Sequence, residues 1–173
     1  MQVSGQKIVV LGTGGTIAGT SAQAGDNIGY TAAQVGVEQL LTALPGLQAL
    51  AEGALVAEQV AQIDSKDMDG EVWRRLALRC AHHLNDPEVK GLVITHGTDT
   101  LEETAWFLHE VLDAAKPVVL TCAMRPATAL TPDGPQNLLD AVATVLAPGA
   151  TGVLAVAAGE VHGARYVQKV HPY

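Results

Sequence analysis

The sequence alternates short apolar runs with stretches whose apolar residues recur at helical spacing, and this alternation limits the folds open to the chain. Valine-rich apolar runs are typical of strands buried on both faces, as in a parallel sheet. Such strands, alternating with amphipathic helices, predict a doubly wound α/β fold: a mostly parallel sheet with helices on both faces, flavodoxin-like or Rossmann-like, in three layers. The expected strands are residues 7–11, 55–60, 91–96, 117–122 and 152–157, and the expected helices are residues 35–44, 73–80, 101–112 and 138–145.

Two short motifs mark helix ends within this pattern. Pro45-Gly46 is expected to stop the helix at 35–44, and Thr100 with Glu103 has the spacing of a capping box at the start of the helix at 101–112. No repeat, low-complexity segment or linker interrupts the pattern, so residues 1–173 are expected to form a single domain.

The expected fold predicts where a ligand binds. In open α/β sheets, ligands bind beyond the carboxyl ends of the parallel strands, at a topological switch point. Polar residues with distinctive chemistry gather in the five segments that follow the strands, which are residues 12–30, 63–69, 96–100, 123–131 and 159–169.

Composition excludes several classes of partner. The net charge of −8 argues against nucleic acid and against an anionic membrane surface. No apolar stretch is long enough to span a membrane. The first residues lack the features of a secretory signal, and Cys80 and Cys122 read as buried free thiols, so a cytoplasmic protein is expected.

Familiar cofactor motifs do not fit. Position 17 is Ile where a dinucleotide fingerprint needs glycine, and the chain has neither a Gly-Lys-Ser/Thr phosphate loop nor a G-x-S-x-G elbow. His82 and His83 are adjacent on an expected helix and point in different directions, and Asp64 to Gly70 lacks calcium-loop spacing. Neither a metal nor a cofactor is expected.

Hydroxyl groups remain as the candidate reactive groups. Thr16 lies in the glycine-rich turn "LGTGGTIAGT" (11–20), where a threonine is either a nucleophile or a partner of loop amides. Thr98 and Asp99 lie between a strand end and a helix start, and provide a hydroxyl and a carboxylate beyond what a helix cap needs. Asp99 suits a ligand ammonium group and Ser65 a ligand carboxylate, although each residue also suits an ordinary cap or turn.

At these residues the chain resembles the bacterial-type L-asparaginases, which hydrolyse asparagine to aspartate and ammonia. "TGGTIAG" (13–19) and "HGTDT" (96–100) are specific to that family. The resemblance covers essentially the whole chain but only the family's N-terminal domain. Further matching segments are "GYTAAQVGVEQLL" (29–41), "QIDSKDMDGEVW" (62–73), "VITHGTDTLEETAWFL" (93–108), "PVVLTCAMRP" (117–126) and "DGPQNLLDAV" (133–142).

The resemblance implies five catalytic residues. Thr16 matches the nucleophilic threonine that forms an aspartyl ester, and Tyr30 matches the loop tyrosine that helps to accept its proton. Thr98 matches the second threonine, Lys169 matches the family lysine beside it, and Asp99 matches the aspartate that binds the substrate ammonium and completes this second triad.

It also implies substrate-binding residues. Thr98 and Asp99 belong to this set, Ser65 matches the serine that holds the substrate carboxylate, and the backbone of Ala123 is expected to contact the side-chain amide. Lys66 stands where the family often has Gln, and its cation is expected to strengthen carboxylate binding or to alter selectivity.

The chemistry of such a site is coherent, but the residues leave alternatives open. Backbone N–H groups near Thr98 suit the developing oxyanion, and a lysine whose pKa is lowered by burial suits a base. Lys169 is equally compatible with a solvated lysine near the chain end. The sequence leaves open whether Thr16 or Thr98 attacks first, or whether water attacks directly.

The family's C-terminal domain, which lends an acidic residue to a neighbouring active site, has no counterpart in the sequence. A short natural form and a truncated piece both fit, and a homo-oligomer, either a dimer or a tetramer, is expected. The preferred function is an L-asparaginase with weak glutaminase activity. The alternatives are a non-catalytic amino-acid-binding domain and a subunit of an amidotransferase acting on misacylated tRNA, which the acidic charge disfavours.

Overall fold

A six-stranded sheet forms the centre of the molecule. The computed structural model describes residues 6–23, 26, 29–51 and 55–171. The strands are adjacent in the order β4-β1-β5-β6-β7-β8; the first five run parallel and β8 is antiparallel to β7. The strands are β1 (Lys7–Gly14), β4 (Leu55–Ile63), β5 (Val89–Thr95), β6 (Val118–Thr121), β7 (Val153–Ala157) and β8 (Glu160–Gly163).

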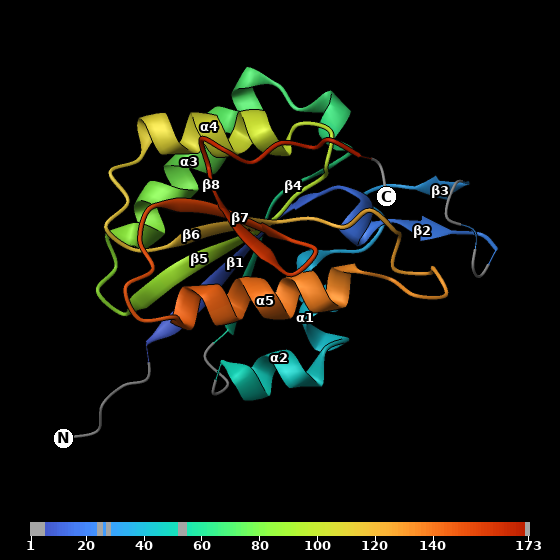
Figure 1. Ribbon diagram of the computed structural model, residues 1–173, viewed down its shortest axis with the longest axis horizontal. Coiled ribbons are helices and arrows are strands. Elements are labelled where there is room, and N and C mark those ends of the chain that lie inside the picture. Colours follow the sequence, from blue (N-terminus) through green and yellow to red (C-terminus); the bar gives the residue numbers. More distant parts are fainter. Residues whose placement is uncertain (1–5, 24–25, 27–28, 52–54, 172–173) are drawn as a thin grey trace.

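Helices cover both faces of this sheet (Figure 1). The helices α3 and α4 lie on one face, and α1, α2 and α5 lie on the other, which confirms the predicted three-layer α/β fold with a mostly parallel sheet. The helices are α1 (Val37–Thr42), α2 (Pro45–Leu50), α3 (Gly70–Leu84), α4 (Leu101–Val111) and α5 (Gly134–Leu146).

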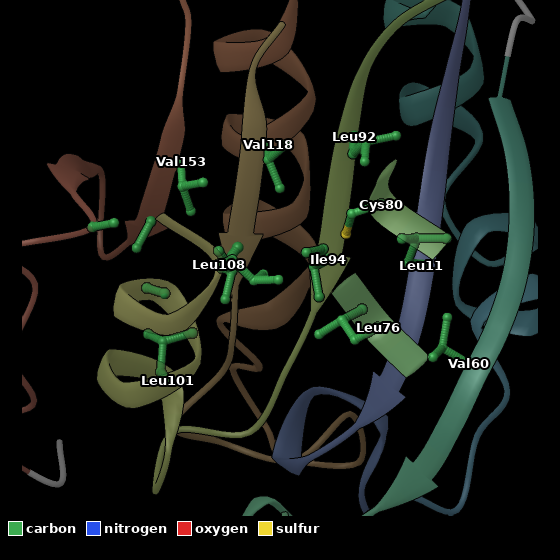
Figure 2. Packing of buried hydrophobic residues seen from close by; sticks show 14 of the residues in the cluster. Leu11, Val60, Leu76, Cys80, Leu92, Ile94, Leu101, Leu108, Val118 and Val153 are labelled. Carbon is green, nitrogen blue, oxygen red and sulfur yellow. The ribbon is translucent and has the colours of Figure 1, made fainter. Parts of the chain in front are cut away.

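Two hydrophobic cores explain the continuous apolar runs in the strands. Successive side chains of a strand point to opposite faces, so a strand covered on both faces needs apolar residues at every position. In β1, Val9 and Leu11 pack towards α3 and α4, as Figure 2 shows for Leu11. Ile8 and Val10 pack towards α1, α2 and α5. The expected strands at 55–60, 91–96, 117–122 and 152–157 each lie largely within an observed strand.

Several local details differ from the sequence predictions. The first helix ends at Thr42, and Pro45 begins α2 instead of only ending a helix, because proline fits the first turn of a helix. The predicted capping box is wrong: Thr100 is the N-cap of α4, but its side chain makes no cap hydrogen bond and donates instead to the carbonyl of Ser65. Sequence patterns also gave no sign of β8 or of a small antiparallel pair, β2 (Thr20–Ser21) with β3 (Tyr30–Thr31).

The strand order places a switch point at β1. The chain leaves β1 to form β4 on one side and later returns to form β5 on the other. Such a point opens a crevice beyond the carboxyl ends of the two strands. The turn that carries Thr16 follows β1, the loop 96–100 follows β5, and β2 and β3 extend from the same end of the sheet (Figure 1).

Candidate active site

Glycines allow the loops after β1 and β5 to touch. Gly15 has a φ of 77°, and a Cβ there would lie under 3.0 Å from the Cα of Gly97. A Cβ at Gly97 would in turn lie under 3.0 Å from the Oγ of Ser65. Real Cβ atoms do not approach so closely, so glycine is needed wherever these backbones meet. This contact brings Thr16, Ser65 and Thr98 to one place.

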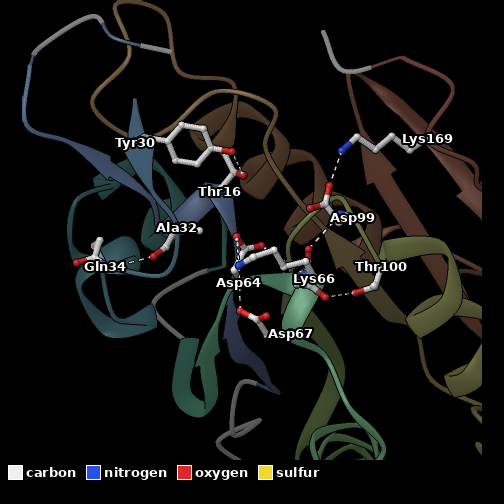
Figure 3. Close-up of polar contacts among 11 residues, drawn as sticks. Thr16, Tyr30, Ala32, Gln34, Asp64, Lys66, Asp67, Asp99, Thr100 and Lys169 are labelled. Carbon is white, nitrogen blue, oxygen red and sulfur yellow. Dashed lines mark hydrogen bonds and ion pairs between the residues drawn. The ribbon is translucent and has the colours of Figure 1, made fainter. Parts of the chain in front are cut away.

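The first hydroxyl pair consists of Thr16 and Tyr30. Thr16 begins a short 3-10 turn (Thr16–Ala18) directly after β1 and is buried. Its Oγ1 lies 2.8 Å from the Tyr30 hydroxyl on β3 (Figure 3). Either hydroxyl can be the donor, so the pair can pass a proton in either direction. Thr13, by contrast, donates to the carbonyl of Thr95, which is a structural role.

The second constellation joins the loop after β5 to the segment after β8. Lys169 Nζ donates to Thr98 Oγ1 at 2.7 Å and to Asp99 Oδ1 at 2.8 Å. The backbone N–H of Lys169 donates to the Glu102 carboxylate on α4, which fixes the segment. From the sequence, Lys169 was expected to be buried, so that desolvation would make it a base. Its side chain is instead 30% exposed.

Ser65 is part of this loop cluster. It is only 3% exposed, and its Oγ accepts the backbone N–H of Asp99 at 3.1 Å. The Thr100 hydroxyl donates to the Ser65 carbonyl at 2.9 Å. Within the described part of the chain no acceptor takes the Ser65 hydroxyl hydrogen, so this hydrogen is available to an anionic ligand.

Lys66 does not stand beside Ser65 as an unpaired cation. Its Nζ lies 3.0 Å from carboxylate oxygens of both Asp64 and Asp67 (Figure 3). The hydrogen bond to Asp64, followed by that to Asp67, raises the pKa of the Lys66 ammonium. Lys66 therefore neutralises two neighbouring carboxylates.

Asp133, the N-cap residue of α5, and Asn137 within that helix hold the chain around Ala123. Ala123 follows β6 and is fully buried. Asp133 accepts the backbone N–H groups of Met124 and Arg125, both at 2.9 Å, and Asn137 donates to the carbonyl of Cys122 at 2.9 Å. Both residues lie in the family-matching segment 133–142, but neither had a predicted role in the site.

His96 is a further residue of the site that had no predicted role. It is fully buried, its Nδ1 lies 2.7 Å from the Gly97 carbonyl oxygen, and its Nε2 lies 3.0 Å from the Thr104 hydroxyl. Because a carbonyl only accepts, Nδ1 carries the hydrogen and the neutral ring accepts from Thr104. Burial lowers the pKa of His96 to about 4, against the weaker opposing effect of the Gly97 carbonyl. His96 thus holds the loop 96–100 as a neutral residue.

Neither a metal cluster nor a membrane-spanning helix accompanies these groups in the described ranges. Within residues 6–171, leaving out 24–25, 27–28 and 52–54, no three His, Cys, Asp or Glu side chains gather as metal ligands would. Across the same ranges, no helix has the length and apolar character needed to cross a membrane. The site described above consists of two hydroxyl groups with a proton partner each, an adjacent carboxylate and a buried serine, a set suited to acyl transfer.

Comparisons with known proteins agree with this chemistry. The family described as "Asparaginase, N-terminal" matches residues 7–173. L-asparaginase 2 of Bacillus subtilis is 43% identical over 166 residues, covering 95% of this chain and 44% of that protein. The glutaminase-asparaginase of Pseudomonas fluorescens is 44% identical over 165 residues, covering 94% of this chain and 45% of that protein.

A solved structure shares the fold. The crystal structure of a probable cytoplasmic L-asparaginase from Campylobacter jejuni matches with a TM-score of 0.91 and 44% identity, over 96% of this chain and 51% of that one. The chain thus spans about half the length of the relatives it matches.

Proposed function

The chain belongs to the asparaginase family, and on this premise we propose that the protein hydrolyses L-asparagine to L-aspartate and ammonia. The observation that carries the proposal is the pair of hydroxyl constellations, Thr16 with Tyr30 and Thr98 with Lys169 and Asp99. The enzyme is an amidohydrolase that needs no cofactor. Glutamine is a weaker second substrate, in line with the name of the Pseudomonas relative.

In the first half of the reaction, the Thr16 Oγ attacks the carboxamide carbon. Its proton passes to the Tyr30 hydroxyl, 2.8 Å away, and onward to the departing nitrogen, so that ammonia rather than amide anion leaves. The carbonyl oxygen gains negative charge in this step, and backbone N–H groups of the loop that carries Thr98 stabilise it. The product of this half is an aspartyl ester on Thr16.

In the second half, water cleaves the ester. The Thr98 hydroxyl accepts a hydrogen bond from Lys169, which leaves its own hydrogen free to orient the water or the substrate amide. Asp99 accepts from the same ammonium and keeps Lys169 directed at Thr98. The water proton moves through this network, and the threonine hydroxyl is restored.

Substrate recognition uses the groups around the two hydroxyls. The Asp99 carboxylate pairs with the α-ammonium group, and the Ser65 hydroxyl donates to the α-carboxylate. Lys66 compensates the charge of Asp64 and Asp67 beside this subsite. The backbone of Ala123 contacts the carboxamide group.

We also propose the domain organisation, the localisation and the oligomeric state of the protein. Residues 1–173 form one α/β domain, supported by the single sheet that joins most strands of the described part. The protein is cytoplasmic, supported by two buried free cysteines and by its likeness to the probable cytoplasmic L-asparaginase of Campylobacter jejuni. It forms a homo-oligomer, a dimer or a tetramer, supported by the exposed apolar side chains of Leu130, Tyr166 and Val170. A monomer in light scattering would refute the last point.

Ammonia release from asparagine tests the proposed activity. The wild-type protein is expected to release ammonia, and Thr16→Ala is expected to lose at least about 10²-fold in kcat while staying folded. Thr13→Ala is the matched control, because Thr13 lies three positions earlier, in β1, and its hydroxyl donates to the Thr95 carbonyl. A wild-type protein that binds asparagine but releases no ammonia is instead an amino-acid-binding domain.

A further inference from the structure

The carboxylate of Asp133 does not bond the N–H groups at the start of its own helix. Asp133 is the N-cap residue of α5, and an aspartate there normally accepts an N–H group from its own helix. Its side chain makes no such bond. Instead, Oδ2 accepts from Met124 N and Oδ1 from Arg125 N, both at 2.9 Å. The side chain of Asp133 therefore bonds the loop after β6 and does not cap α5.

Asn137 holds the same loop from the next turn of the helix. Residues four apart share one face of a helix, so Asn137 lies beside Asp133. It is 3% exposed; its Nδ2 donates to the Cys122 carbonyl at 2.9 Å, and its Oδ1 accepts from Ala158 N at 3.1 Å. Both ends of its amide group are used for holding backbone.

These bonds fix the two peptide planes that flank Ala123. In a trans peptide, the C=O of one residue and the N–H of the next point in opposite directions. Because Met124 N–H points at Asp133, the Ala123 carbonyl points away from it. Because the Cys122 carbonyl points at Asn137, the orientation of the Ala123 N–H is also set.

The Ala123 carbonyl lacks a partner in the described part of the chain. Ala123 is fully buried, and no hydrogen bond among the described residues involves its carbonyl oxygen. Buried carbonyls in native proteins are nearly always paired, so this one, at the end of a strand beside the switch point, lacks a donor, which a ligand NH₂ group would supply on reaching the oxygen.

We propose that Asp133 and Asn137 are positioning residues that direct the Ala123 carbonyl at the NH₂ of the substrate carboxamide, and that they thereby make the site prefer a carboxamide to a carboxylate. The inference rests on the proposed function. A carbonyl oxygen accepts the hydrogen of an amide, whereas the carboxylate of aspartate has no hydrogen to give and is repelled. Sites built around such a bond discriminate strongly against ligands that lack the donor.

Equilibrium binding in a Thr16→Ala background tests the inference, because asparagine is not consumed there. Calorimetry measures the affinities for asparagine and for aspartate with and without Asp133→Asn, which replaces one acceptor oxygen by an NH₂ group. The asparagine-to-aspartate affinity ratio is expected to fall about tenfold, the effect of one lost hydrogen bond. Asp140→Asn is the matched control, because Asp140 lies on the same helix and its side chain accepts from the Gln136 side chain, away from the loop.

Asp133→Ser separates positioning from stability. A serine suits an N-cap position but is too short to reach both loop amides, so the start of α5 is not destabilised and the ratio is still expected to fall. An unchanged ratio in a folded Asp133→Asn or Asp133→Ser protein overturns the inference, as does a background protein that binds aspartate as tightly as asparagine. If wild-type protein releases no ammonia while the ratio behaves as expected, the proposed activity fails and the positioning role stands.

Discussion

The ammonium nitrogen of Lys169 lies 2.7 Å from the hydroxyl oxygen of Thr98, although 71 positions separate the two residues in the sequence. The strand β8 turns the chain back along β7, and the segment after β8 then runs along α4 from Glu110, which Arg165 contacts, to Glu102, which accepts the backbone N–H of Lys169. The reactive hydroxyl and its cation therefore depend on the segment after β8 being held against the first turn of α4.

The first prediction concerns this cation. Lys169→Met is expected to lower kcat for ammonia release by about 10²- to 10⁴-fold, because the proton network around Thr98 loses its charged donor. Lys90→Met is the control, since Lys90 lies near the amino end of β5, away from the site. Equal activity of both variants would remove Lys169 from the mechanism.

The second prediction concerns the contact between the loops. Gly97→Ala is expected to lower the free energy of unfolding by about 1–3 kcal/mol and to reduce activity, because the new Cβ would lie under 3.0 Å from the Oγ of Ser65. Chemical denaturation measures the change. Gly46→Ala provides the contrast: nothing lies within 4 Å of its Cβ position in α2, so it is expected to leave stability unchanged or to increase it.

The third prediction concerns pH. Burial lowers the pKa of His96 to about 4 in the folded protein, against 6.5 for an ordinary histidine. Between these values the unfolded state binds the proton and the folded state does not, so the free energy of unfolding falls as the pH drops from 6.5 to 4. The loss attributable to His96 amounts to about 3 kcal/mol and is absent above pH 6.5.

Denaturation of wild type and His96→Gln at several pH values measures this contribution. His96→Gln is less stable at neutral pH, because it disturbs the bonds to Gly97 and Thr104, but its stability is expected to depend less on pH between 4 and 6.5. Parallel curves for the two proteins would show that His96 takes up no proton on unfolding.

Sequence patterns predicted the layers of the fold because burial on both faces imposes apolar residues along whole strands. β1, β5 and β6 were recognisable for this reason. Short edge elements such as β2, β3 and β8 escaped notice because they are half-exposed and carry no such pattern. The same limit applies to α2, whose proline was taken only as an end signal.

For the candidate site, the family resemblance identified which residues belong to it. The hydrogen-bond partners of these residues became clear only from the folded structure. Position alone suggested that Thr100 caps a helix, yet its hydroxyl bonds Ser65, 35 positions earlier. Likewise, the side chain of Asp133 bonds Met124 and Arg125 rather than its own helix. Such choices depend on which backbone groups the folded chain brings near, and local sequence does not encode that.

The fourth prediction concerns Lys66. Its Nζ lies 3.0 Å from both Asp64 and Asp67, so Lys66→Gln leaves two carboxylates uncompensated beside Ser65. Their repulsion of the substrate carboxylate is expected to raise KM for asparagine several-fold with little change in kcat, and the increase shrinks at high salt because these groups are exposed. The double variant Asp64→Asn with Lys66→Gln restores part of the balance and is expected to recover part of the KM. A KM equally high in the double variant would mean that Lys66 acts on the substrate directly rather than through its neighbours.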